Sequence, residues 1–304
     1  MGNNISNSIK GIITKGVGGT YTVRASDGDL LLCQIRGGLR GKKITPAIGD
    51  MVTVSPSGDP DIPYVLEKIG KRKNDLVRPP LSNVDMLILV FAVKDPEPDL
   101  KLLDKMLIVC AVKDIVPVIV FTKADLDPVN AKKLFDIYSR CGYRVFCSSA
   151  DNKPHIEDLV GDTASEGGII AFAGPSGVGK STLCNHIIGT EVMLIGDISS
   201  RLGRGKHTTR HVELFDYKGY LITDTPGFTS LDLFELGITH DMVADGYPEI
   251  REKSRNCRFS DCRHIAERDC AVRDDPDMDP GRYERYKEFF VQLYESRFDY
   301  SKRK

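Results

Sequence analysis

Residues 174–181 read Gly174-Pro175-Ser176-Gly177-Val178-Gly179-Lys180-Ser181, which fits the phosphate-binding loop pattern G-x-x-x-x-G-K-[ST]. The apolar run 169–172 before it predicts a strand, and the residues from Lys180 onward predict a helix. In such a unit, backbone N–H groups and the positive end of the helix surround phosphate oxygens. The stretch therefore predicts a phosphate site at the carboxyl edge of a parallel α/β sheet.

Two side chains of this loop have distinct expected roles. The Lys180 ammonium should reach the outer phosphates, and the Ser181 hydroxyl should bind Mg²⁺. The phosphate-contacting set expected from the motif is Gly174, Pro175, Ser176, Gly177, Val178, Gly179, Lys180, Ser181 and Thr182.

A second phosphate-side motif follows downstream, where a predicted strand ends in Asp224-Thr225-Pro226-Gly227. Asp224 is expected to hold Mg²⁺ through water, and the Gly227 N–H to contact the outermost phosphate. The stretch 203–210 is polar and glycine-rich, and we expect its Thr209 to add a hydroxyl to Mg²⁺. A disordered basic linker is the alternative interpretation of that stretch.

The motif expected to contact the base lies upstream, at Thr122-Lys123-Ala124-Asp125. A carboxylate at Asp125 can accept two hydrogen bonds from guanine that adenine cannot supply, which makes such a site selective. Ser148, Ser149 and Ala150 follow the next predicted strand and fit a loop that closes over the guanine edge. Taken alone, T-K-x-D could be an ordinary strand-to-helix turn. The usual base motif of GTPases also begins with Asn, whereas this chain has Thr122.

The order of these motifs is unusual, because in ordinary GTPases the base motif follows the phosphate loop. Here Asp125 precedes Lys180. The sheet of an ordinary GTPase can still form if that protein's N- and C-termini are joined and the chain is opened after the D-T-P-G motif instead. The order therefore predicts a circularly permuted P-loop GTPase domain of doubly wound α/β type.

The group that orients the attacking water is less evident. Ras-like enzymes use a Gln shortly after D-x-x-G, whereas Phe228 follows Gly227 here. A phenyl ring cannot orient water, so we expect slow hydrolysis by the isolated protein. His207 is the candidate catalytic residue if a partner orders its loop; the alternative is an exposed loop histidine.

The N-terminal part predicts a small β-barrel of the oligonucleotide-binding (OB) type. Glycine turns separate candidate strands at 10–15, 20–25, 30–35, 51–55 and 64–68. Residues 1–80 carry twelve Lys/Arg against seven Asp/Glu, a bias compatible with nucleic acid. In the loop 36–43 we expect RNA contact by Arg36, Arg40, Lys42 and Lys43. A barrel adaptor with a solvated hairpin is the alternative.

The C-terminal part carries Cys257-x4-Cys262-x-His264-x5-Cys270. Three thiolates and one imidazole form a closed ligand set for one structural Zn²⁺ ion. A helix is predicted over 282–297, with its apolar stripe as a packing face. The other five cysteines lie in apolar surroundings and are expected to be buried free thiols: Cys33, Cys110, Cys141, Cys147 and Cys184.

Composition sets the broad class. The chain has 304 residues, 41% of them hydrophobic, and a net charge of −1, which fits a soluble protein of two or three domains. We predict domains at 1–70, 71–236 and 237–304. With neither a signal peptide nor an apolar span in the sequence, we expect a cytoplasmic monomer without membrane contact.

Taken together, these motifs resemble the ribosome small-subunit-dependent GTPase A family, the bacterial circularly permuted GTPases of the YjeQ/EngC type. The resemblance covers the basic barrel, the permuted domain with G-P-S-G-V-G-K-S and D-T-P-G, and the C-x4-C-x-H-x5-C cluster. It implies GTP hydrolysis to GDP stimulated by the small ribosomal subunit, binding to its ribosomal RNA, and a role in late maturation of that subunit. Thr122 in place of Asn is the main departure.

Two alternatives stay open at this stage. One is a GTP-regulated RNA-binding module with little turnover of its own, which Phe228 would permit. The other is an ATP-dependent P-loop enzyme, which Asp125 argues against.

Overall fold

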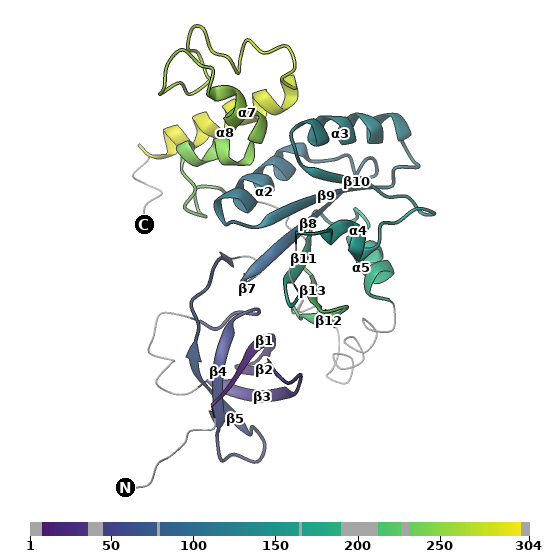
Figure 1. Ribbon diagram of the computed structural model, residues 1–304, viewed down its shortest axis with the longest axis vertical. Helices are drawn as coiled ribbons and strands as arrows, with labels where there is room; N and C mark the ends of the chain where they lie inside the picture. The colour runs from purple at the N-terminus through teal and green to yellow at the C-terminus, as the bar shows by residue number, and fades with distance from the viewer. Residues whose placement is uncertain are drawn as a thin grey trace. The chain divides into compact units, whose positions relative to one another are not determined.

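The computed structural model describes residues 8–35, 45–77, 80–163, 166–189, 212–225 and 231–298. Five strands form a closed barrel in the order β1-β2-β3-β5-β4 (Figure 1). They are β1 (Ile9–Val17), β2 (Thr20–Ala25), β3 (Leu30–Ile35), β4 (Met51–Pro56) and β5 (Tyr64–Ile69). β3 and β5 run parallel, and the other neighbours run antiparallel. The predicted five-stranded barrel is confirmed.

Inward-facing side chains fill the barrel, because successive residues of a strand point to opposite faces. Ile13, Val23, Val54 and Leu66 are fully buried there. Cys33 lies among them, and burial raises the pKa of its thiol to about 12. Of the five cysteines predicted to be buried free thiols, Cys33, Cys110, Cys141 and Cys184 are buried and free, whereas Cys147 is free but only half-buried.

A buried carboxylate holds the end of the barrel to the chain that follows. Asp50 accepts hydrogen bonds from Arg72 Nε at 2.6 Å and from Ser82 Oγ at 2.7 Å. Ser82 belongs to a hairpin of β6 (Asp75–Leu76) and β7 (Leu81–Ser82), which the sequence did not predict. Two-residue strands are too short to show periodicity. Because a buried charge needs such partners, Asp50 ties the hairpin to the barrel.

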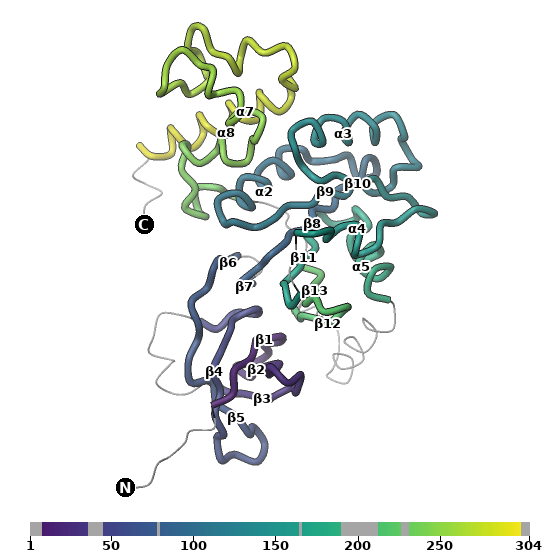
Figure 2. Tube along the Cα trace, viewed as in Figure 1, coloured from purple at the N-terminus to yellow at the C-terminus, as the bar shows by residue number. Residues whose placement is uncertain are grey.

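The permuted domain contains a six-stranded sheet in the order β10-β9-β8-β11-β13-β12, which can be followed along the tube in Figure 2. Its strands are β8 (Val84–Ala92), β9 (Val116–Thr122), β10 (Arg144–Cys147), β11 (Ile169–Ala173), β12 (Phe215–Tyr217) and β13 (Tyr220–Asp224). β10 is parallel to β9 and β11 to β13, whereas β12 is antiparallel to β13. The predicted α/β class is confirmed.

One strand differs from its predicted position. Taken by itself, the stretch 212–216, Val-Glu-Leu-Phe-Asp, predicts a strand, but β12 begins only at Phe215. The physical reason lies in the preceding residues, which pair with the barrel instead: the Leu214 N–H donates to the Thr14 carbonyl at 2.9 Å.

The chain forms two compact units. The first holds the described residues within Met1–Met86, Ala164–Phe172 and Cys184–Pro226, and the second those within Leu87–Thr163, Ala173–Leu183 and Gly227–Lys304. The base motif and the phosphate loop 174–181 thus belong to the same unit.

The helices are α2 (Leu100–Val112), α3 (Pro128–Arg140), α4 (Ile156–Val160), α5 (Lys180–Ile188), the 3₁₀-helix η1 (His240–Gly246), α7 (Pro248–Ser254) and α8 (Pro280–Ser296). The short α4, η1 and α7 were not predicted. Asp99, Asp127 and Asp279 cap α2, α3 and α8 by accepting a backbone N–H with the side chain. None of the described helices combines the length and the apolar character needed to cross a membrane.

A fully buried arginine joins the C-terminal helix α8 to α2 and α7. The Arg282 guanidinium donates to Asp104 at 2.6 Å and to Glu249 at 2.6 Å. Burial opposes its charge, but the two carboxylates outweigh this and hold the pKa of Arg282 well above its usual value. Three aromatic rings also face the guanidinium, those of Tyr138, Tyr143 and Tyr247.

We predict that Arg282→Met lowers the free energy of unfolding by about 3 kcal/mol or more, because two carboxylates would lose a buried partner. Lys101 offers a matched control, since it pairs with Glu288 between the same two helices, α2 and α8, but is 58% exposed. Lys101→Met should cost less than about 1 kcal/mol. Denaturant unfolding measures both, and equal losses would contradict this account of the interface.

Candidate functional site

The phosphate loop leaves the fully buried strand β11 and leads into α5. Gly174 has φ +153°, and a Cβ there would clash with the Val90 carbonyl oxygen of β8. Only glycine fits this close approach. Val178 is buried and fixes the loop to the protein, whereas Ser176 and Gly177 are exposed. The loop therefore has an anchored start and an exposed tip.

The base motif is linked directly to that loop. Thr122 Oγ1 donates a hydrogen bond to the Val178 carbonyl at 2.5 Å, across 56 residues of sequence. The same hydroxyl lies 3.4 Å from the Phe91 carbonyl. The threonine that replaces the usual Asn thus still reaches the phosphate loop. Two motifs in reversed sequence order are brought together in one compact unit.

The rest of the base motif is held by the neighbouring loop. Lys123 has a left-handed φ of 56°, and Asp125 is exposed. The Ala124 N–H donates to the Ser148 carbonyl at 3.0 Å, which joins the base motif to the predicted closing loop. Ser148 is buried, and the Ser149 N–H donates to the Asn152 carbonyl at 2.8 Å. Ala150 is exposed beside them.

A third loop borders this cluster, and the sequence reasoning missed it. The Lys123 ammonium donates to the Asp95 carbonyl, and Pro96 is the residue nearest to the open side of Gly177. Asn130 Nδ2 donates to the Val93 carbonyl at 3.0 Å. No motif marks residues 93–96, so only the fold could reveal that this loop supports both the base motif and the phosphate loop.

The magnesium-side motif follows β13, which is parallel to β11 and pairs Asp224 with Phe172. Thr225 is fully buried, and its N–H and hydroxyl both donate to the Phe172 carbonyl, at 3.1 and 2.7 Å. Asp224 is partly exposed at the carboxyl end of its strand. Carboxylate oxygens are hard ligands of the kind that Mg²⁺ prefers, so Asp224 fits the role predicted for it.

Several predicted residues lie outside the described part of the chain. They are the RNA-contact candidates Arg36, Arg40, Lys42 and Lys43, the magnesium candidate Thr209, the phosphate-contact candidate Gly227 and the catalytic candidate His207.

The predicted metal ligands come together in the C-terminal part. The ligand atoms of Cys257, Cys262, His264 and Cys270 all lie within 4.8 Å of one another. His264 Nδ1 is 3.5 Å from Cys257 Sγ and 3.4 Å from Cys270 Sγ. One Zn²⁺ ion at about 2.0–2.3 Å from each ligand atom would fit such a set. Because all four positions are protein ligands, the site suits a structural ion.

Surrounding hydrogen bonds orient this cluster. The Arg273 N–H donates to Cys270 Sγ at 3.4 Å, and Tyr283 on α8 donates to the His264 carbonyl at 2.8 Å. Burial lowers the pKa of His264, and the nearby Glu267 carboxylate opposes this only in part. The lowered pKa favours the neutral imidazole, which is the form that binds metal. Glu267 accepts three backbone N–H groups of the same loop, from Arg263, Ile265 and Ala266.

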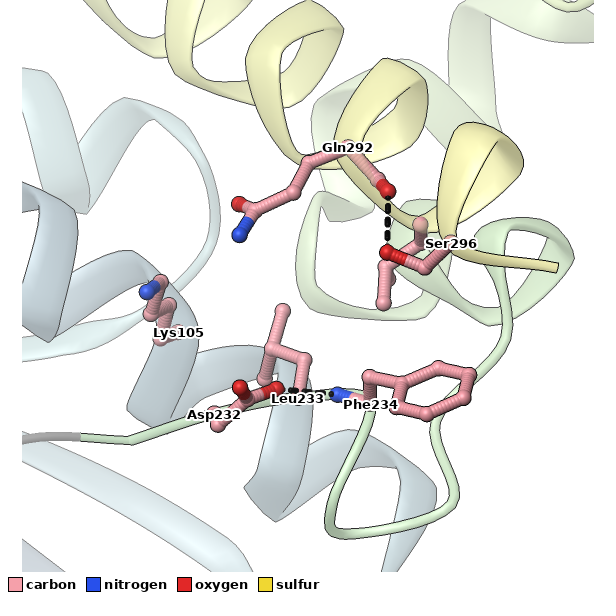
Figure 3. Close-up of a pocket in the computed structure, with 7 residues that line it drawn as sticks. Lys105, Asp232, Leu233, Phe234, Gln292 and Ser296 are labelled. Atoms are coloured by element: carbon pink, nitrogen blue, oxygen red, sulfur yellow. Dashed lines mark hydrogen bonds between the residues drawn. The ribbon is translucent and has the colours of Figure 1, made fainter. Parts of the chain in front are cut away.

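A small pocket is lined by Lys105 of α2, by residues 232–234 and by three residues of α8 (Figure 3). The Lys105 ammonium donates to the Leu231 carbonyl at 3.1 Å and lies 5.6 Å from the centre of the Phe289 ring. Gln292 and Ser296 of α8 complete the far wall. These contacts hold residues 231–234 against α2 and α8.

Two known family models match this chain, one over the nucleotide-binding domain and one over the barrel. The model of the RsgA GTPase matches residues 69–234, which include the base motif, the phosphate loop and Asp224. The chain belongs to the RsgA GTPase family. The model of the RsgA N-terminal domain matches residues 10–61, the barrel. The Cys/His cluster lies outside both matched ranges.

Relatives and solved structures agree over nearly the full length. The "Small ribosomal subunit biogenesis GTPase RsgA" of Geobacillus kaustophilus is 40% identical over 94% of this chain and 98% of its own. The crystal structure of YloQ, a circularly permuted GTPase, has a TM-score of 0.75 at 33% identity and covers 97% of this chain and 98% of that one. YjeQ from Thermotoga maritima has a TM-score of 0.75 at 30% identity, with 94% and 99% covered. The circular permutation of YloQ agrees with the reversed motif order of this chain.

We predict that Gly174→Ala weakens GDP binding by tenfold or more, because about 1.4 kcal/mol of strain in the loop already corresponds to that factor. Gly142→Ala is the matched control: Gly142 also has a positive φ, 86°, but nothing lies within 4 Å of its added Cβ. Titration with a fluorescent GDP measures both. Unchanged affinity in a folded Gly174→Ala variant would exclude the close approach to Val90 as a requirement of the site.

We also predict about one tightly bound zinc ion per chain and its loss in Cys262→Ser, because a closed site needs all four ligands. Cys147→Ser should keep the metal, since Cys147 is not part of the cluster. Elemental analysis of freshly purified protein measures both. Full zinc retention by Cys262→Ser would remove that residue from the ligand set.

Proposed function

We propose that this chain is a GTP hydrolase that is stimulated by the small ribosomal subunit and acts in late maturation of that subunit. The observation that supports this most is the Thr122–Val178 hydrogen bond, because it joins a guanine-type base motif to a phosphate loop. Relatives named as small ribosomal subunit biogenesis GTPases, aligned over nearly the whole chain, supply the ribosomal part of the proposal.

In this proposal one guanine nucleotide lies along the phosphate loop and the base motif. Backbone N–H groups of residues 174–182 surround the phosphates, and the Lys180 ammonium contacts the outer ones. Asp125 accepts two hydrogen bonds from the base, and the Lys123 stem lies against the base plane. Ser148 to Ala150 close over the base edge. The exposure of Asp125 leaves its carboxylate accessible to a ligand.

Mg²⁺ would be held by Ser181, Thr209 and Asp224, and when bound it neutralises charge that develops on the phosphates. The Gly227 N–H would contact the outermost phosphate. Phe228 follows Gly227 and cannot orient water, so slow intrinsic turnover is expected. His207 is proposed as the group that orients the water once the small subunit orders its loop.

The barrel is proposed to contact the ribosome, and the Cys/His cluster is proposed to stabilise the C-terminal part. Arg36, Arg40, Lys42 and Lys43 of the barrel loop would contact phosphates of ribosomal RNA. One Zn²⁺ ion would stabilise the C-terminal part. We propose that the protein acts in the cytoplasm as a monomer. Family membership favours true turnover over a binding module without hydrolysis.

The proposal predicts that small ribosomal subunits raise the GTP hydrolysis rate by tenfold or more, since ordering of a catalytic group is worth about that factor or more. Large subunits should have little effect. Measurement of phosphate release with small subunits, large subunits and neither tests this. A rate that small subunits leave unchanged would contradict the proposed function.

A variant of the base motif tests the choice of base independently of stimulation by the small subunit. Asp125→Asn should lose GTP hydrolysis and gain hydrolysis of xanthosine triphosphate, because the amide changes the donor and acceptor pattern offered to the base. Retained GTP preference in this variant would exclude Asp125 as the residue that selects guanine.

A further inference from the structure

The barrel strand β1 carries a bulge at Thr14. Its pairing with β2 joins Ile13 to Val23 and Lys15 to Thr22, which leaves Thr14 as an extra residue. A bulge interrupts the ladder and leaves backbone groups that need other partners. At this point the Thr14 carbonyl accepts the Leu214 N–H at 2.9 Å, and Lys15 forms an antiparallel bridge with Glu213.

Buried residues and two ion pairs reinforce this contact. Thr14 and Leu214 are 6% and 5% exposed. The Lys15 ammonium lies 2.8 Å from the Glu213 carboxylate, and both side chains are 28% exposed. Arg24 of β2 forms a second ion pair with Asp216. The barrel therefore holds residues 213–216 by backbone, packing and charge together.

Those residues lead directly to the predicted magnesium ligand. β12 begins at Phe215, turns at Lys218-Gly219 and pairs with β13, with Phe215 opposite Ile222. β13 then ends at Asp224. β12 has three residues and is the last strand of its sheet. A strand this short at an edge has few ladder hydrogen bonds of its own, and the contacts of residues 213–216 with the barrel add to them.

We propose that Lys15 and Glu213, with the bulge at Thr14, are positioning residues that fix the β12–β13 hairpin and, through it, the Asp224 carboxylate at its end. The inference rests on the proposed function, in which Asp224 holds Mg²⁺ through water. The pair does not touch the nucleotide. It acts by fixing the first residues of the β12–β13 hairpin to the barrel, so that a shift of the hairpin displaces the carboxylate at its end.

The test uses the full chain and a charge swap. The variants are Lys15→Glu, Glu213→Lys and the double exchange, with Lys10→Glu, an exposed lysine on the same strand, as the matched control. The readout is the Mg²⁺ concentration that half-maximally slows dissociation of a fluorescent, non-hydrolysable GTP analogue. Hydrogen exchange of the Leu214 amide reports the contact itself.

Each single charge reversal should raise that Mg²⁺ concentration by about threefold or more, and the double exchange should return it to within about twofold of the wild type, as expected for a directly coupled pair. Leu214 exchange should speed up in the single variants and recover in the exchange. Lys10→Glu should change neither readout. Glu213→Gln, which removes charge without reversing it, should shift both readouts in the same direction by less.

Unaltered Mg²⁺ dependence in the folded single variants would overturn the inference, as would a double exchange that restores stability but not the Mg²⁺ dependence. If a reversal fails to fold, Glu213→Gln decides the outcome by the same readouts. A wild-type protein that binds no GTP analogue, or binds it without any Mg²⁺ dependence, would instead contradict the proposed function.

Discussion

The hydrogen bond from Thr122 to the Val178 carbonyl is the contact on which the site depends. It joins the end of β9 to the phosphate loop, and the Ala124–Ser148 bond extends the link to the end of β10. A nucleotide-binding site needs its base-reading and phosphate-binding groups at a fixed separation, because binding selectivity comes from groups that are already in place. The circular permutation changes the connections between strands but leaves this constraint intact.

Buried carboxylates join neighbouring segments within each compact unit. Asp50 ties the barrel to the β6–β7 hairpin through Arg72 and Ser82, and Asp104 ties α2 to α8 through Arg282. Breaking a buried pair costs far more than breaking a surface pair. These two carboxylates therefore hold the β6–β7 hairpin to the barrel, and α8 to α2, more strictly than the exposed ion pairs nearby.

Much of the fold could be predicted where one residue pattern decides the structure. The strands 20–25 and 30–35 have the predicted bounds, and the Cys/His cluster forms as its spacing indicated. The β6–β7 hairpin, α4, η1 and α7 were missed because they are too short for periodicity to appear. Residues 212–214 were predicted as part of a sheet strand and pair with the barrel instead. The loop 93–96 was missed because it supports the base motif through backbone carbonyls, which every residue has and which therefore leave no pattern in the sequence.

The most direct measurement of the central claim is a crystal structure of the full chain with bound GDP. One GDP molecule should contact Asp125 through its base and the backbone of residues 174–181 through its phosphates, with the Thr122–Val178 bond intact. A structure in which the base lies away from Asp125 while the phosphates occupy the loop would contradict a single guanine nucleotide site built from both motifs.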